Sequence, residues 1–229
     1  MIVNTVARRR LDPPVAVALF LVIAFCMTMT ARATSIPHTN VFEAGMDAVF
    51  SQAAFGGNNI DIRFNPVVTL NNASLLSIDS LAELTALIGS VAVPANTATM
   101  YFVDAINFCD GPEVVGGCAE VTGDDMLIDI DFASANLNSH ELGHNLGLGH
   151  VATNGRLMDP NITGTLLIAG EVTTINANGA GIIQTEVGGQ RFVSITPVHV
   201  TPEPVGAALM SLGLLGLLAI RRRCRRSPA

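Results

Sequence analysis

The spacing of apolar residues predicts a helix followed by a strand at the start of the chain's middle region. Residues 41–55 carry apolar side chains at helical intervals, and Gly56 and Gly57 follow directly, so we expect a helix that ends there. Residues 60–64 alternate apolar and polar side chains, which predicts a strand, and Pro66 bounds it.

Similar patterns continue along the chain. Ser80 and Glu83 have the spacing of a capping box, in which two side chains satisfy free amide groups at a helix start. We therefore expect a short helix from this point that closes at Gly89. Residues 99–106 and 126–130 are rich in apolar side chains and are expected to form two strands.

The second half of the middle region predicts two more helices. Residues 136–146 are expected to form a helix because Gly147 follows them, and residues 166–175 a last one. Residues 190–200 are expected to be extended. The order helix, strand, helix, strand, strand, helix predicts a single layered domain of the α/β (α+β) class.

The N-terminal end is typical of a secretory signal peptide. Arg8, Arg9 and Arg10 precede an apolar block at residues 15–27, and a small-residue exit ends at Ala33. We therefore expect residues 1–33 to be a signal peptide cleaved after Ala33, with an uncleaved anchor helix as the alternative.

The C-terminal end has three parts in a fixed order: Pro-Glu-Pro at residues 202–204, an apolar run at 205–220, and an arginine cluster at 221–226. Residues 201–229 resemble the PEP-CTERM sorting signal of Gram-negative bacteria. The resemblance implies a short transmembrane helix with a basic tail, transient membrane anchoring, and recognition by an exosortase-like processing enzyme. A plain C-terminal anchor is the alternative. Either reading predicts that the body is extracytoplasmic, at the cell surface or secreted.

Charge excludes one class of partner for the body of the protein. Residues 34–200 hold three arginines, no lysine and 17 acidic side chains, a formal charge of −14. Such a surface repels phosphate backbones, so nucleic-acid binding is not expected.

Cysteine placement agrees with export. Cys26 and Cys224 lie in the terminal signals, which leaves Cys109 and Cys118 as a pair in the body. In an oxidising compartment this pair is expected to form a disulfide that closes a glycine-rich loop. Two thiolate metal ligands are the alternative.

The segment 140–150, HELGHNLGLGH, carries the candidate chemistry. His140 and His144 are four residues apart, so on a helix both imidazoles reach one metal ion from the same face. Gly147 permits a sharp exit from the helix, which can bring His150 to the same ion as a third ligand. Glu141 lies beside the ligands, where a carboxylate can act on water held by the ion.

This segment matches the zinc signature HExxHxxGxxH of the metzincin metalloproteases at every fixed position. Met158 follows in the sequence Leu-Met-Asp-Pro, which resembles the Met-turn of the matrixin branch. The resemblance implies a twisted mixed sheet, mostly parallel, above a cleft, an active-site helix, and one catalytic domain at residues 34–200. It also implies His140, His144 and His150 as ligands of one catalytic Zn²⁺, Glu141 as general base, and Met158 as the floor of the site.

The expected activity is zinc-dependent hydrolysis of peptide bonds in a protein or peptide substrate. Zinc-activated water would attack, with Glu141 accepting its proton. The alternative is a non-catalytic, exported, surface- or matrix-associated metal-binding protein. The acidic residues in the range 110–131 could bind calcium, but they lack EF-hand spacing, so a solvated acidic surface is the favoured reading.

Overall fold

The computed structural model describes residues 39–109 and 111–202, which form four α-helices and ten strands with short 3-10 turns. The helices are α2 (Thr39–Phe50), α3 (Leu81–Leu87), α4 (Ala135–Asn145) and α5 (Ala169–Asn178). The strands are β1 (Ile60–Phe64), β2 (Val68–Asn71), β3 (Ser77–Ile78), β4 (Thr97–Val103), β5 (Ala105–Phe108), β6 (Pro112–Val115), β7 (Gly117–Ala119), β8 (Asp125–Asp129), β9 (Ile183–Thr185) and β10 (Arg191–Thr201).

The two terminal signals are not part of this description. The predicted signal peptide at residues 1–33 lies outside the described residues, as do residues 203–229 of the predicted sorting signal. None of the helices in the described ranges is both long enough and apolar enough to cross a membrane.

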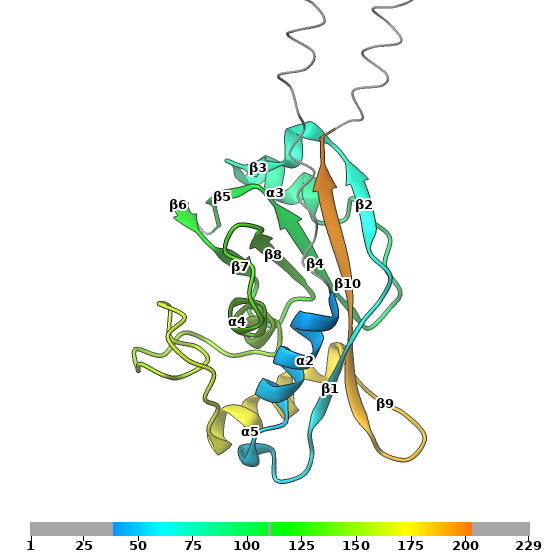
Figure 1. The fold of residues 1–229 in the computed structure, drawn as a ribbon, viewed down its shortest axis with the longest axis vertical. Helices are drawn as coiled ribbons and strands as arrows, with labels where there is room; N and C mark the ends of the chain where they lie inside the picture. The colour runs from blue at the N-terminus through cyan, green and yellow to red at the C-terminus, as the bar shows by residue number, and fades with distance from the viewer. Residues whose placement is uncertain (1–38, 110, 203–229) are drawn as a thin grey trace, which may run out of the picture. The chain divides into compact units, whose positions relative to one another are not determined.

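A mixed sheet with the order β1-β10-β4-β8-β7 organises the described residues (Figure 1). The first four strands run parallel, and β7 is antiparallel to β8 at the edge. The long strand β10 is the last strand along the chain, yet it lies between β1 and β4 in the sheet. It pairs with β1 and then β2 along one side, and with β9 and then β4 along the other.

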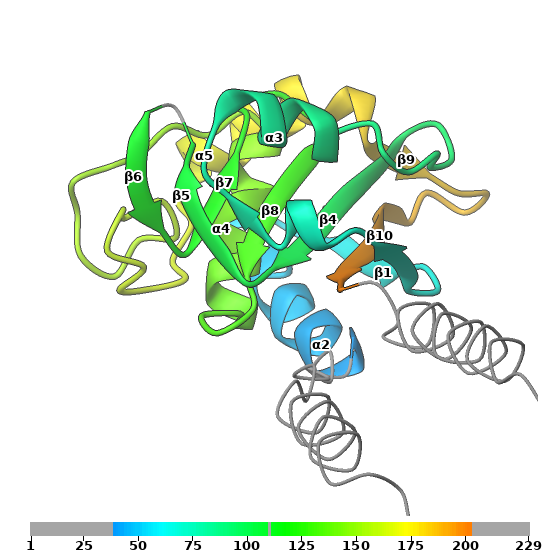
Figure 2. The ribbon, with the colours of Figure 1, turned by 90° about the horizontal axis from the view of Figure 1, so that it is seen from above.

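The sheet is covered on both faces because side chains of a strand alternate in direction. Met100 and Phe102 of β4 pack into a core cluster with α2, α4 and α5, whereas Tyr101 and Val103 join a second cluster with α3. Figure 2 shows α3 and α2 on opposite sides of the sheet. Burial on both faces confirms the expected α/β (α+β) class with a mixed sheet.

Two expected elements are divided in the structure. The helix expected at residues 41–55 ends at Phe50, and a 3-10 turn follows at Ala53–Phe55. Gln52 lies at the break, where its side chain donates to the carbonyl of Thr165 and accepts from the amide of Leu167. Helix α2 therefore ends just before a residue whose side chain is hydrogen-bonded to the distant segment at residues 165–167.

The strand expected at residues 99–106 becomes β4 and β5. The bend is at Asp104, whose amide donates to the Leu76 carbonyl at 2.8 Å. Beyond the bend, β5 joins β3 and β6 in a separate three-stranded sheet. A disulfide between Cys109 and Cys118, with a Cα–Cα distance of 5.9 Å, closes the loop that contains β6. The predicted disulfide is thus confirmed.

Candidate metal centre

Helix α4 presents the first two histidines to one face. Ser134 caps its start, because the Ser134 hydroxyl oxygen accepts from the Leu137 amide at 3.2 Å. The helix packs against α2 and lies along β7 and β8. Its buried position therefore holds His140 and His144, one turn apart, with little freedom to move.

The end of α4 sends the chain back toward these two rings. Gly147 has a φ of 91°, a conformation that glycine adopts without the Cβ clash of other residues. The amides of Gly147 and Leu148 donate to carbonyls of the last helical turn, which closes the helix. Three residues later His150 faces α4, as the sequence pattern predicts.

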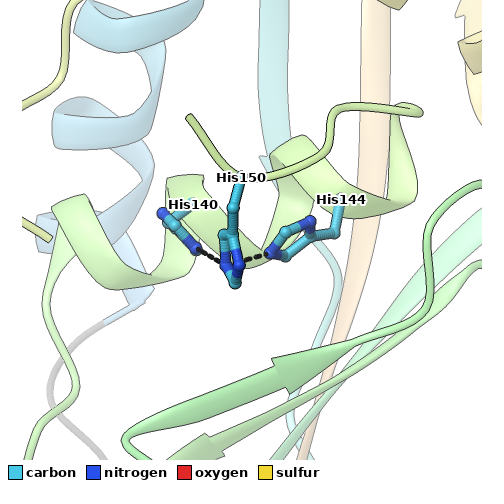
Figure 3. A group of neighbouring side chains, drawn as sticks. All are labelled: His140, His144 and His150. Atoms are coloured by element: carbon cyan, nitrogen blue, oxygen red, sulfur yellow. Dashed lines mark hydrogen bonds between the residues drawn. The ribbon is translucent and has the colours of Figure 1, made fainter. Parts of the chain in front are cut away.

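The three imidazoles converge, as Figure 3 shows. The Nε2 atom of His150 lies 3.2 Å from Nε2 of His140 and 3.1 Å from Nε2 of His144. One nitrogen from each ring can be chosen so that all three lie within 4.8 Å of one another. This group could hold a metal ion, and the arrangement of its three rings is compatible with a zincin motif.

Backbone carbonyls set the orientation of the two buried rings. Nδ1 of His140 donates to the Leu157 carbonyl at 2.7 Å, and Nδ1 of His144 donates to the Leu148 carbonyl at 2.8 Å. Burial lowers the pKa of His140 to about 4 and also lowers the pKa of His144. Both rings are therefore neutral near pH 7, with the proton on Nδ1 and a lone pair on Nε2.

The donor set fits a divalent cation. The lone pairs of His140 and His144 both point at His150 Nε2, which carries at most one proton and can satisfy only one of them. A cation among the rings would accept a lone pair from each. Two nitrogens bound tetrahedrally at zinc's usual ~2.0–2.1 Å are roughly 3.3 Å apart, close to the distances found here.

Glu141 is enclosed beside the histidines. Its side chain is only 4% exposed, and burial raises its pKa to about 8. The carboxylate lies against Gly117 of β7: a Cβ added to Gly117 would be 2.7 Å from Cδ and 2.8 Å from Cγ of Glu141. Any larger residue at position 117 would therefore collide with the Glu141 side chain. A cation held nearby would favour the charged form of Glu141.

Met158 lies beneath the helix that carries the first two histidines. Its side chain is fully buried, and a Cβ added to Gly143 would be 2.6 Å from its sulfur. The Met158 carbonyl accepts from the amide of Val151, the residue after His150, at 2.9 Å. The segment of the third histidine is thereby tied to the segment below the other two.

A cleft of about 810 Å³ opens beside this group. His140, Glu141 and His150 line it. Residues 113–117 from β6 and the start of β7 form a wall of the cleft, and exposed Phe132 lies against that wall at Gly116. The volume lies in the roughly 300–1,000 Å³ range typical of ligand-binding sites.

The predicted site residues come together, but the sequence did not reveal what holds them. Gly117 belongs to a glycine pair whose role is evident only once β7 is placed against α4. The Leu148 and Leu157 carbonyls have no side-chain signature at all. Among the described residues, the group of side chains placed so that it could hold a metal ion consists of the three histidines.

Comparison with known proteins adds nothing to this geometry: no family model, no curated protein and no solved structure matches the chain.

Proposed function

We propose that this protein is an exported, zinc-dependent endopeptidase. The observation that carries the proposal is the convergence of three imidazole nitrogens, two of them neutral and oriented by backbone carbonyls, beside a buried carboxylate. The zinc signature at residues 140–150 supports the same activity. The cleft beside the group gives a substrate chain access to it.

His140, His144 and His150 would hold the ion. When bound, zinc supplies Lewis acidity toward the scissile carbonyl and lowers the pKa of water. Glu141 takes a proton from the attacking water onto a carboxylate oxygen, and it then gives that proton to the leaving amine. The water oxygen joins the carbonyl carbon and the C–N bond breaks, so the products are a carboxylate and an amine.

Burial of Glu141 suits this role. Glu141 acts as a base in its charged form, which a cation held by the three histidines would favour, and burial leaves that carboxylate poorly solvated, so it accepts a proton from water readily. Gly117 and the surrounding cleft wall keep the carboxylate in one place. Positioning of this kind contributes to the rate because the acceptor need not be reoriented at the moment of reaction.

The deciding experiment measures metal content and casein cleavage on the same purified full chain, with and without a chelator. Wild type should bind one zinc per chain and cleave casein. Glu141→Gln should keep the zinc and lose about 10²–10⁴-fold in kcat, whereas His144→Ala should lose the zinc. Zinc binding without cleavage by wild type would favour the alternative, a non-catalytic metal-binding protein. Full activity in Glu141→Gln would overturn the assigned base.

Export is the second part of the proposal. The signal-like N-terminus, the PEP-CTERM-like C-terminus and the Cys109–Cys118 disulfide are all consistent with an extracytoplasmic location. Fractionation of Gram-negative cells that produce the tagged chain tests this, with loss of the arginine cluster at residues 221–226 as the matched variant. Material confined to the cytoplasm would contradict export.

A further inference from the structure

A second groove of about 590 Å³ lies beside β7 and β8, with its own set of lining residues. Helix α3 forms one wall, and the end of β7 with the start of β8 forms the other. None of its lining residues also lines the cleft at the three histidines.

The wall made by α3 is apolar and open to solvent. Leu81 is 62% exposed and Ile88 39%, and across the groove Val121 is 48% exposed. Large apolar side chains exposed together, rather than singly, mark surfaces that bind another molecule.

The opposite wall is acidic. Glu120 and Asp124 are exposed there, and Asp125 is half-buried at the start of β8. Burial raises the pKa of Asp125, and the neighbouring charges of Asp124 and Glu120 raise it further. The three carboxyl groups therefore gain from an added positive charge.

No side chain of the described residues supplies that charge. Residues 39–202 contain no lysine and three arginines, all engaged elsewhere. Arg63 pairs with Asp61 and Glu186, Arg156 pairs with Glu171, and Arg191 donates to the Asn58 carbonyl.

We propose that this groove binds a peptide segment of a partner protein in which arginine or lysine side chains alternate with aliphatic ones. The cationic groups would meet Glu120, Asp124 and Asp125, and the aliphatic ones would cover Leu81, Ile88 and Val121. A bare metal ion would leave the apolar wall in water, and an anionic ligand would be repelled. Binding here requires no peptidase activity.

The groove and the cleft share one strand. Cys118 of β7 lines the groove, while the preceding residue, Gly117, lies against Glu141 and lines the cleft. Because consecutive side chains of a strand point to opposite faces, the groove and the cleft lie on opposite faces of the edge strand β7.

The test uses the full chain with Glu141→Gln, so that the probe is not cut, and fluorescence anisotropy of fluorescein-labelled peptides. The probe is a hexapeptide of alternating leucine and arginine. A serine–arginine and a leucine–glutamate hexapeptide are the comparisons. We expect the leucine–arginine peptide to bind about tenfold more tightly than either, with affinity that falls as salt is raised to about 0.15 M.

Variants locate the binding. Glu120→Gln with Asp124→Asn should weaken it about fivefold and flatten its salt dependence, and Leu81→Ser should weaken it about threefold. Asp104→Asn and Val187→Ser change an exposed acid and an exposed apolar residue outside the groove, and they should leave the affinity unchanged.

Three outcomes would overturn the proposal. Equal affinity for the serine–arginine peptide would show that charge alone acts. Equal weakening by the two outside variants would show that no groove is involved. Weakening only by Glu113→Gln, in the wall of the cleft, would place the peptide at the histidines instead.

Discussion

At the scale of single residues, two glycines determine how closely the parts of the site approach. Gly117 lets β7 lie directly on Glu141, and Gly143 lets α4 lie directly on Met158. In both places a Cβ would fall within 3 Å of an atom of a buried side chain, so the neighbour would have to move. Packed interiors have few voids into which such a side chain could retreat.

Gly117→Ala should therefore displace the Glu141 carboxylate without touching a histidine. We expect zinc content to stay at the wild-type level and kcat/KM for casein to fall at least about tenfold, because a shift of an ångström in a proton acceptor costs that much or more. Gly111→Ala is the matched control, since a Cβ there meets nothing within 4 Å. Equal activity in the two variants would show that Glu141 does not need this contact.

The raised pKa of Glu141 predicts how the free energy of unfolding of the metal-free protein depends on pH. Its pKa is raised from 4.5 to about 8, so the folded state favours the protonated carboxyl. That contribution to stability is complete below pH 4.5 and is lost as pH rises through 8. Urea denaturation with chelator present should show Glu141→Gln gaining on wild type by a few kcal/mol between pH 5 and 9. Parallel curves for the two proteins would contradict the raised pKa.

At the scale of elements, the helices and strands that could be predicted from the sequence are those that depend on a local pattern of residues. The strand at residues 60–64 and the helix that carries His140 and His144 lie where apolar spacing and capping place them, within one residue. Strands β6 and β7 were not expected, because they are short and stand in a glycine-rich loop that a distant cysteine pair closes. The place of β10 inside the sheet depends on its pairing with β1 and β4, which no local pattern records.

The disulfide stabilises the segment that forms one wall of the cleft. It spans nine residues between β5 and β7, and the chain-entropy relation for a loop of this length gives about 2.5 kcal/mol. The double variant Cys109→Ala/Cys118→Ala should lose about that much free energy of unfolding in urea. Reduced wild type should match it, whereas reductant should not affect the double variant. A reduced wild type as stable as the oxidised protein would contradict this role.

At the scale of the whole molecule, the candidate metal centre depends on how the fold bends residues 140–157 back on themselves. Helix α4 supplies His140 and His144, the returning loop supplies His150, and the Leu157 carbonyl orients His140 from beyond that loop. An unfolded chain does not hold these groups together, so an ion that binds them binds the folded state alone. The free energy of metal binding is then added to the free energy of unfolding.

Zinc should consequently raise the Tm of the protein. At 100 times the Kd, the gain is about 2.7 kcal/mol, which for a domain of this size corresponds to a rise in Tm of roughly 5–10 °C. Calorimetry should show this rise in wild type and in Glu141→Gln, and its loss in His144→Ala. Because burial lowers the pKa of His140 to about 4 and also lowers that of His144, protons compete with zinc at these two rings only below the ordinary histidine value of 6.5. A rise of the same size in His144→Ala would mean that zinc stabilises the protein from somewhere other than these three rings.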